Sequence, residues 1–572
     1  MARYDEDQTH SKFMHAGDSV APHTCAKISE LGFTCPNMKP DGQCSVTGGR
    51  HPVSFAMTIP QLVSALRVVK PVPVKHRKIA DLVLDSLKVE GTFYAAKDDK
   101  SLHYFYNIEK KLYAIDGSDF RALCCELFGM NAAEPEYKFV LSALETYANR
   151  YGTVVEFFRF ARFTSGVLYI NAGKNQVFRL DGKAVKTVDN GTDGILFRNS
   201  AEVEPIEAAA TYTGSPVKEY LVSTLNCDSQ PLHDLYWVFI YALFFESLLP
   251  TKPIVLISGE KGSGKSFTGR ALKQALFGRE SNVDTGLTSD EKNAKAAFAN
   301  NYFLCMDNVD GKITWMANLL ASVSTGTLIK ERKLYENNVE VVFTPRCFVM
   351  INSREPTSLK RDDVVDRLLI FPVERYAEFV PDAQLLERIS SNRSVIWAEL
   401  LANLNRIVKR LKTGVPLVMK DQRLADFANV GLLIGKVIRA SSARQAFSKL
   451  EESRNALVLE DHPLLAALNQ YITRHPKPEW VATGKLFQEV RDHNYSYPVK
   501  SAQYFGQQLK GLSSNLRSYL DIQFRTGAHN VREVRIGALG QFSKPKPNSE
   551  KPKKLGTTVT TKSKVNNFID ER

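Results

Sequence analysis

The chain has 572 residues, enough for roughly three or four globular domains of ordinary size. Its hydrophobic fraction of 44% and charged fraction of 24% are those of a soluble globular protein. The formal net charge of +13 favours a polyanionic partner such as nucleic acid, although many basic proteins bind none.

The apolar segments argue against a membrane protein. The longest apolar run, residues 235–245, is about half a membrane span long and lies between Asp234 and Glu246. We therefore expect a buried helix there and no contact with a membrane. The N-terminus is charged and lacks the apolar region of a signal peptide. The eight cysteines indicate intracellular thiols rather than disulfides, which predicts a cytoplasmic protein.

The N-terminal segment, residues 1–70, contains candidate zinc ligands. They are three cysteines and two histidines: Cys25, Cys35, Cys44, His23 and His51. The three cysteines with one of the histidines, for which we favour His51, would give the four ligands of a Zn²⁺ site. The cysteines are separated by nine and eight residues, so the close cysteine pair of a standard zinc finger is absent. The alternative is a turn-rich lobe with half-buried cysteines.

Residues 75–225 show a mixed pattern of helices and strands. Helical periodicity in residues 79–87, 120–130 and 136–152 alternates with strand-like runs that continue to about residue 198. This pattern predicts an α/β domain. The segment carries no recognisable catalytic cluster, and a domain that serves packing alone explains it equally well.

A phosphate-binding loop is predicted at residues 253–266. A short apolar strand is followed by Gly259, Gly264, Lys265 and Ser266, which fit the pattern G-x-x-x-x-G-K-[ST], and then by a helix-like segment. Lys265 would reach the β and γ phosphates of ATP, and Ser266 would donate its hydroxyl oxygen to Mg²⁺. The predicted nucleotide-binding residues are Gly259, Glu260, Lys261, Gly262, Ser263, Gly264, Lys265, Ser266 and Phe267.

A second apolar strand ends in Asp307, about forty residues after the loop lysine. This arrangement is typical of a Walker B strand, whose carboxylate holds Mg²⁺ through water, so Ser266 and Asp307 form the predicted metal site. The next residue is Asn308, where many ATPases carry a glutamate that polarises the attacking water. Either Asp310 or another group takes that role, or Asn308 positions the water with its amide.

Two further polar residues are predicted at the nucleotide. Residues 346–353 form a strand that we expect between the other two, with Asn352 at its end near the γ phosphate or the attacking water. Arg367 follows an acidic run at a helix-to-strand junction and matches an arginine finger supplied to a neighbouring subunit. These parts define a predicted ATPase core over residues 230–375.

The C-terminal third is predicted to be helical and then mixed. Residues 376–460 have helical periodicity and would form a lid over the nucleotide. Residues 461–540 read as three helices and a hairpin that turns at 527–529, the order of a winged helix. Such a domain serves either DNA binding or protein docking. Residues 541–572 are rich in lysine, proline and threonine and are predicted to be a disordered basic tail.

Together these motifs resemble those of AAA+ superfamily III helicases of phages, plasmids and integrated mobile elements. The resemblance is carried by GEKGSGKS, MDNVDGKITWMANLLASVSTG, ERKLY, FVMINS and DDVVDRLLIFPV, and it is specific over residues 230–430. The D-R-L element is also similar to minichromosome-maintenance helicases, and helicases of staphylococcal chromosome cassettes are of this mixed type. The chain departs from many relatives at Asn308.

The resemblance implies an ATP hydrolase that works as a hexameric ring on single-stranded or forked DNA. It implies replication of a phage or mobile element in a bacterial, archaeal or phage-infected cell. Expected partners are a primase, a single-strand-binding protein or a polymerase, and residues 75–225 would form an accessory or DNA-contacting collar. The alternative function is an ATP-dependent initiator or loader that remodels an origin without processive unwinding. A primase activity has little support, because no second acidic metal cluster is visible.

The resemblance also assigns a role to residues 326–346, which read as two strands around a turn at 336–338. In superfamily III rings a hairpin in this position projects into the pore. Here it carries Lys330, Arg332 and Lys333, which would follow the DNA phosphates without reading sequence. The alternative is a solvated hairpin at a subunit interface, with Arg332 reaching a neighbour's nucleotide.

Overall fold

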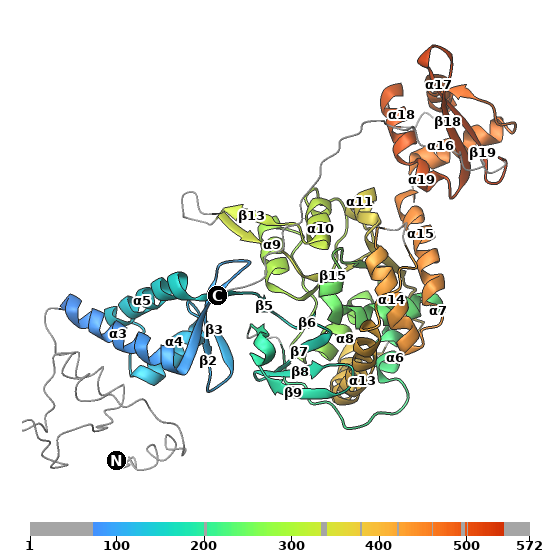
Figure 1. The fold of residues 1–572 in the computed structure, drawn as a ribbon. Coiled ribbons are helices and arrows are strands. Elements are labelled where there is room, and N and C mark those ends of the chain that lie inside the picture. Colours follow the sequence, from blue (N-terminus) through green and yellow to red (C-terminus); the bar gives the residue numbers. More distant parts are fainter. Residues whose placement is uncertain are drawn as a thin grey trace, which may run out of the picture. The chain divides into compact units, whose positions relative to one another are not determined.

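The computed structural model is a mixed α/β structure (Figure 1). It describes residues 72–198, 203–332, 340–377, 380–419, 423–459, 462–493, 498–499 and 501–542. The chain forms two compact units, Met1–Arg454 and Asn455–Arg572. The candidate zinc ligands, Lys333 and the C-terminal tail from residue 543 lie outside the described residues, so these predictions stay predictions.

The first described region packs three helices against a four-stranded sheet of order β3-β2-β1-β4. The strands β1, β2 and β3 form an antiparallel meander, and β4 pairs with β1 in parallel. Aromatic side chains such as Phe93, Tyr104 and Phe120 fill the buried core between the two layers. The elements are α3 (Val72–Glu90), β1 (Gly91–Ala96), β2 (Leu102–Tyr106), β3 (Lys111–Ala114), α4 (Ser118–Phe128), α5 (Pro135–Tyr151) and β4 (Thr153–Val155).

A second, antiparallel sheet of order β6-β7-β8-β9 follows, and a small parallel pair flanks it in the sequence, with β5 before the sheet and β10 after it. Phe178 of β8 lies 6.4 Å from Trp397 of α13, measured between ring centroids, and Asn405 of α13 accepts a hydrogen bond from the N–H of Gly182 at 2.8 Å. The predicted domain at 75–225 therefore contains two four-stranded sheets and the β5–β10 pair, and the sheet β6–β9 packs on a helix of the predicted lid. The elements are β5 (Phe157–Phe158), β6 (Ala161–Thr164), β7 (Val167–Gly173), β8 (Gln176–Leu180), β9 (Val185–Asp189), η2 (Thr192–Gly194), β10 (Leu196–Phe197) and α13 (Arg393–Leu411).

A parallel four-stranded sheet of order β12-β15-β11-β16 forms the centre of the larger unit (Figure 1). Its strands are short apolar runs with nearly every residue buried, as expected for a parallel sheet covered on both faces. The strand β15 lies between β11 and β12, which confirms the order predicted from the sequence. The strands are β11 (Ile254–Ser258), β12 (Phe303–Met306), β15 (Phe348–Ser353) and β16 (Leu368–Pro372).

Helices surround this sheet. The predicted buried helix at 235–245 is confirmed, since α7 and the following 3₁₀ segment bury every residue of the run. No helix among the described residues is both long and apolar enough to cross a membrane. The remaining helical elements of this unit are α6 (Pro216–Tyr220), η3 (Val222–Thr224), α7 (Gln230–Ala242), η4 (Leu243–Leu248), α8 (Lys265–Phe277), α9 (Glu291–Asn300), α10 (Met316–Thr325), η5 (Thr357–Leu359), α11 (Asp362–Val365), α12 (Asp382–Ser391), α14 (Ala425–Ile438) and α15 (Ala443–Leu459).

The hairpin predicted within residues 326–346 is present in the backbone. The strands β13 (Ile329–Arg332) and β14 (Glu340–Phe343) pair antiparallel, with Ile329 opposite Phe343 and Arg332 opposite Glu340. The connecting residues, 333–339, lie outside the described part of the chain. The predicted strand pairing is thus confirmed, and the role of Lys330, Arg332 and Lys333 stays a prediction.

The second unit contains helices followed by a three-stranded sheet of order β17-β19-β18. The long hairpin β18–β19 turns at residues 527–531, two residues longer than the predicted turn at 527–529, and its inner face packs on the helices through Leu520, Val534 and Ile536. The unit begins within α15, a few residues before the predicted boundary at 461. The elements are α16 (Pro463–Arg474), β17 (Val481–Ala482), α17 (Thr483–His493), α18 (Ala502–Gly511), α19 (Ser513–Leu516), β18 (Leu520–Thr526), η6 (Ala528–Asn530) and β19 (Arg532–Ala538).

Candidate functional site

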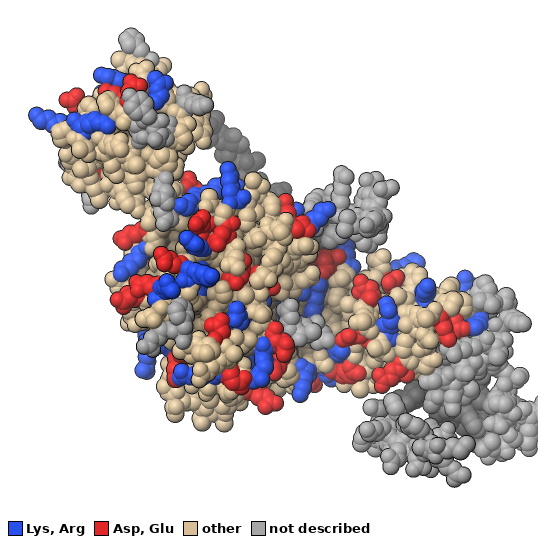
Figure 2. Space-filling model, turned by 180° about the vertical axis from the view of Figure 1, so that it is seen from behind, with Lys and Arg blue, Asp and Glu red and all other residues tan. Residues whose placement is uncertain are grey.

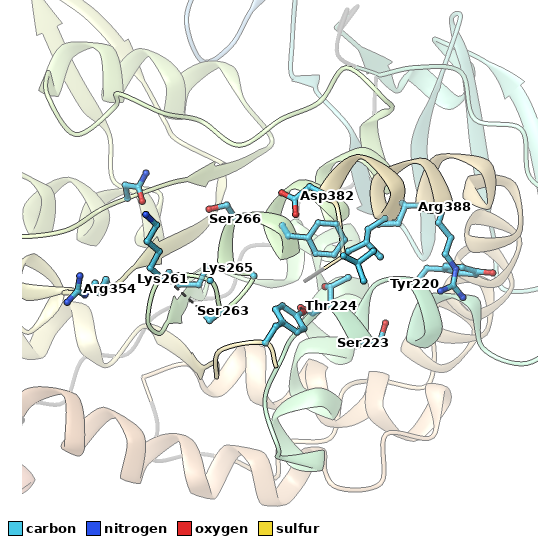
Figure 3. Close-up of a pocket in the computed structure, with 18 of the residues that line it drawn as sticks. Tyr220, Ser223, Thr224, Lys261, Ser263, Lys265, Ser266, Arg354, Asp382 and Arg388 are labelled. Atoms are coloured by element: carbon cyan, nitrogen blue, oxygen red, sulfur yellow. Dashed lines mark hydrogen bonds between the residues drawn. The ribbon is translucent and has the colours of Figure 1, made fainter. Parts of the chain in front are cut away.

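A pocket of about 690 Å³ opens where β11 leads through residues 259–264 into α8. Its volume lies within the usual range of small-ligand sites, about 300–1,000 Å³. One end is lined by the glycine-rich loop and the residues that follow β12 and β15, and we call it the phosphate end. The other end is lined by residues 219–224, by Tyr376 and by residues 380–389, and we call it the base end (Figure 3).

The loop needs glycine at three positions for two different reasons. Gly262 and Gly264 have φ of +83° and +79°, in the left-handed region that other residues avoid. Gly259 has no such φ, but a Cβ there would collide with the carbonyl oxygen of Val373. The glycines of the motif therefore allow a tight turn whose N–H groups and helix N-terminus face the pocket, the arrangement that binds anions.

Lys265 is the first residue of α8 and lies over its own loop. Its Nζ donates hydrogen bonds to the carbonyl oxygens of Gly259 and Glu260, both at 2.7 Å. Burial lowers the pKa of Lys265, while the carboxylates of Asp310 and Asp307 act in the opposite direction. The ammonium group thus lies at the mouth of the loop, where it can bind phosphate oxygens instead of its own carbonyls.

Three elements bring Ser266, Asp307 and Asn352 together, as the sequence predicted. The hydroxyl of Ser266 lies 2.8 and 2.9 Å from the two carboxylate oxygens of Asp307. The amide Nδ2 of Asn352 donates to Asp307 Oδ1 at 3.2 Å, and Asn352 is fully buried. A hydroxyl and a carboxylate are the oxygen ligands that Mg²⁺ prefers, so this donor set fits that ion.

The two alternatives for the attacking water, Asn308 and Asp310, differ in their surroundings. Both line the pocket. Asp310 Oδ1 accepts hydrogen bonds from the Ser353 hydroxyl and the Arg354 N–H, both at 2.7 Å, and from the Glu355 N–H at 3.0 Å. Although burial acts the other way, these bonds lower the pKa of Asp310. Asp310 is therefore held as an acceptor and is a weak base.

Arg367 lies away from this cluster. It sits between α11 and β16, its side chain is 8% exposed, and it donates to the backbone carbonyl of Asp363. Burial, with a smaller contribution from Arg423, lowers its pKa. It is not among the residues that line the pocket of its own chain, so the predicted role in a neighbouring subunit stays a prediction.

The base end contains residues that sequence reasoning missed. The N–H of Tyr376 donates to Gly262 O at 3.3 Å and its hydroxyl donates to Thr224 O at 3.2 Å, which lays the ring against Gly264. Arg388 donates to Glu219 at 2.9 Å and lies 5.1 Å from the ring of Tyr220 (Figure 3). These residues come from segments more than 150 positions apart, and no local sequence motif predicts their role.

Comparison with known proteins gives one family match. Residues 236–453 match the family model described as an actinomycete integrative conjugative element replication protein. This span contains the phosphate end, the hairpin β13–β14 and the helices up to α15. No curated protein matches the chain.

Solved structures give weaker likenesses. An apo form of the NrS-1 C-terminal region is 11% identical, covers 80% of this chain and 99% of its own, and has a TM-score of 0.41. A second apo structure of that region has 11% identity, covers 80% of this chain and 98% of its own, and has a TM-score of 0.40. A JCV helicase structure is 14% identical, covers 43% of this chain and 66% of its own, and has a TM-score of 0.22.

Proposed function

We propose that the chain is an ATP-dependent DNA helicase with an AAA+ core of the phosphate-loop type. The observation that carries the proposal is the cluster of Ser266, Asp307 and Asn352 beside Lys265, because it joins a phosphate-binding loop to two strand ends of one parallel sheet. A strand–loop–helix unit with a carboxylate on another strand is the arrangement that binds a nucleoside triphosphate.

The residues divide the work of hydrolysis. The N–H groups of the loop and Lys265 bind the β and γ phosphates, and Ser266 and Asp307 hold Mg²⁺. When bound, Mg²⁺ would neutralise part of the phosphate charge. Asn352 fixes the carboxylate of Asp307 and, with Asn308, orients the attacking water by hydrogen bonds. Arg367 of a neighbouring subunit completes the charge stabilisation, which requires an oligomeric ring, a hexamer on the resemblance noted above.

Hydrolysis would be coupled to DNA through the hairpin β13–β14. Its sequence carries Lys330, Arg332 and Lys333, which suit a phosphate backbone. The face of the larger unit drawn in Figure 2 mixes basic and acidic side chains without one large basic field. DNA binding by the hairpin alone is therefore more consistent with this surface than DNA binding across the whole face. The matched family model, a replication protein of an integrative element, supports replication of a mobile element as the process.

The helices and hairpin of the second unit favour a second candidate, an initiator or loader. We propose that this unit is a winged helix that binds duplex DNA, because six basic and two acidic residues occupy positions 498–542. A chain with such a unit could open an origin without processive unwinding. A cytoplasmic location, with a primase, a polymerase or a single-strand-binding protein as partner, fits both the helicase and the initiator.

A strand-displacement assay tests the proposal. The purified chain is given ATP, Mg²⁺ and forked DNA with either a 3′ or a 5′ single-stranded tail, with Lys265→Ala as the inactive control. Displacement with one tail polarity, abolished in the control, is expected. ATP hydrolysis with binding but no displacement on either fork would contradict the helicase and favour the initiator.

The same assay tests whether the hairpin binds DNA. Replacing Lys330 and Lys333 by alanine should leave DNA-free ATP hydrolysis near the wild-type rate while removing DNA stimulation and displacement. It should also reduce the salt dependence of single-strand binding, because fewer phosphates are neutralised. Displacement at the wild-type rate by the double variant would exclude the hairpin as the DNA-binding element that couples hydrolysis to unwinding.

A further inference from the structure

An ion pair between a buried lysine and a half-buried aspartate lies outside the pocket, on the elements that carry the predicted metal ligands. Lys273 is on α8, eight residues after Lys265, and its Nζ lies 3.0 Å from Asp284 Oδ2. The Lys273 side chain is only 8% exposed. A buried ammonium group is strongly unfavourable without a partner, so Asp284 determines where this part of α8 can lie. Neither residue lines the pocket.

Asp284 in turn binds the free edge of β12. Its N–H donates to Cys305 O at 2.7 Å, and its carbonyl oxygen accepts from the N–H of Asp307 at 3.1 Å. Its carboxylate accepts from the N–H of Cys305 at 3.1 Å through the same oxygen that binds Lys273. Since β12 ends the row of four strands, Asp284 serves as a one-residue strand beside it.

A second contact joins the same two elements. Gly269 of α8 lies directly against Cys305 of β12, and a Cβ at Gly269 would collide with the sulfur. The helix that begins with Lys265 and Ser266 is therefore fixed to the strand that ends before Asp307 at two points. One point is this close approach, and the other is the pair of Lys273 and Asp284.

We propose that Lys273 and Asp284 are positioning residues that set the distance between Ser266 and Asp307 and thereby the affinity for the divalent cation. This inference rests on the proposed nucleotide site. The carbonyl oxygen of Asp284 accepts the backbone N–H of Asp307 itself, so a displaced Asp284 would also displace the carboxylate that must hold a water ligand of the ion. Mg²⁺ tolerates little departure from octahedral geometry at about 2.0–2.1 Å, which makes a small displacement matter.

The test measures metal affinity without relying on turnover. Mn²⁺ replaces Mg²⁺ as a paramagnetic probe and is titrated into the full chain with a non-hydrolysable ATP analogue, for wild type, Lys273→Met, Asp284→Asn and Lys273→Arg. Lys273→Met keeps the length of the side chain and removes the charge. Loss of a group that orients a metal ligand typically weakens metal binding about 10-fold or more. We expect such a loss in Lys273→Met and Asp284→Asn and partial recovery in Lys273→Arg.

Two controls separate positioning from general destabilisation. Analogue binding in EDTA should be equal in all variants, because neither residue of the pair lines the pocket. Arg279→Met removes an exposed ion pair with Glu387, 3.0 Å long and about 60% exposed on both sides, and should leave Mn²⁺ affinity unchanged. Measurements are made at a temperature where the melting curve shows each variant folded.

The outcomes distinguish this inference from the proposed function. Weakened Mn²⁺ affinity with intact analogue binding supports it, whatever the unwinding assay shows. Wild-type Mn²⁺ affinity in Lys273→Met overturns the positioning role and does not affect the proposal of a nucleotide site. Absence of Mn²⁺ binding to the wild-type complex would overturn the metal site of the proposed function, and the positioning role with it.

Discussion

The two ends of the pocket are built in different ways. The phosphate end is a contiguous loop, residues 259–266, whose Ser266 donates a hydrogen bond to Asp307 after β12. Asn352 of the neighbouring strand β15 donates to the same carboxylate. The base end is assembled by packing from residues 219–224, Tyr376 and residues 380–389, which meet only in the folded chain. The first end is therefore defined by backbone conformation and parallel strand order, and the second by tertiary contacts.

This difference predicts a division of effects. If the proposed hydrolysis takes place at the phosphate end, the charges and hydrogen-bond donors there would act on atoms whose charge changes in the reaction, so substitutions should act on kcat. At the base end, the proposed nucleotide would place its non-reacting part against a lining that includes Tyr220, Tyr376 and Leu385. Substitutions there remove binding that is equal in the ground and transition states, which raises KM.

The largest effect is expected from Lys265→Ala and Asp307→Asn. Each should lower kcat for ATP hydrolysis by at least about 10²-fold, since each removes a preorganised charge at the reacting phosphate. Asp307→Asn should retain nucleotide binding because the loop is intact, as measured by fluorescence titration beside a phosphate-release assay. Substantial turnover by Lys265→Ala would show that this loop is not the catalytic one.

Substitutions of Asn308 and Asp310 test which residue of the phosphate end acts on the attacking water. Asn308 has φ of +56°, so glycine is the replacement that removes the amide without strain. We expect Asn308→Gly to lower kcat by about 10²-fold if the amide orients the attacking water. Asp310→Asn should cost less, because an amide oxygen can accept the same three hydrogen bonds.

The pH profile checks the same assignment. Hydrogen bonds hold the pKa of Asp310 below its ordinary value, so it stays ionised as the pH falls from 8 to about 5. The rate should therefore show no acid limb from Asp310 in that range. A limb near neutral pH that disappears in Asp310→Asn would contradict this and make Asp310 the base.

The sequence predicted the phosphate end because its chemistry is encoded locally. The spacing of Gly264, Lys265 and Ser266 defines the loop, and apolar runs that end in Asp307 and Asn352 predict strands whose carboxyl ends meet in a parallel sheet. Backbone geometry carries this information, so the motif and the strand order suffice.

The base end and the sheet contacts were missed for a physical reason. Tyr376 and Asp284 act through residues 152 and 21 positions away, and their roles depend on packing that no spacing records. The sheet β6–β9 lies in the predicted N-terminal domain yet packs on α13, because the aromatic face of one strand covers Trp397. Composition does not show which surfaces meet.

A moderate effect is expected at the base end from Tyr376→Ala. The ring lies against Gly264 in the pocket, and loss of an aromatic platform for a base is worth about 1–3 kcal/mol. KM should rise about 10-fold with kcat within about twofold. Tyr376→Phe removes only the hydroxyl bond to Thr224 and should behave nearly as wild type. A fall in kcat of the Ala variant with unchanged KM would break the division between the two ends.

The smallest effect on turnover, below about fivefold, is expected from Gly269→Ala, which tests how tightly the phosphate end is built. The new methyl group would collide with the sulfur of Cys305, so the larger unit should lose about 1–3 kcal/mol of stability despite the better helix propensity of alanine. Cys305→Ala removes that sulfur, and in the double variant the two changes should compensate each other. The measurement is the free energy of the unfolding transition that ATP analogue shifts, for both single variants and the double one. Interaction energies between contacting residues are typically about 0.5–3 kcal/mol. Additive losses of stability would therefore show that α8 and β12 are not in contact at this point. One of the two links between the elements that carry Ser266 and Asp307 would then be absent.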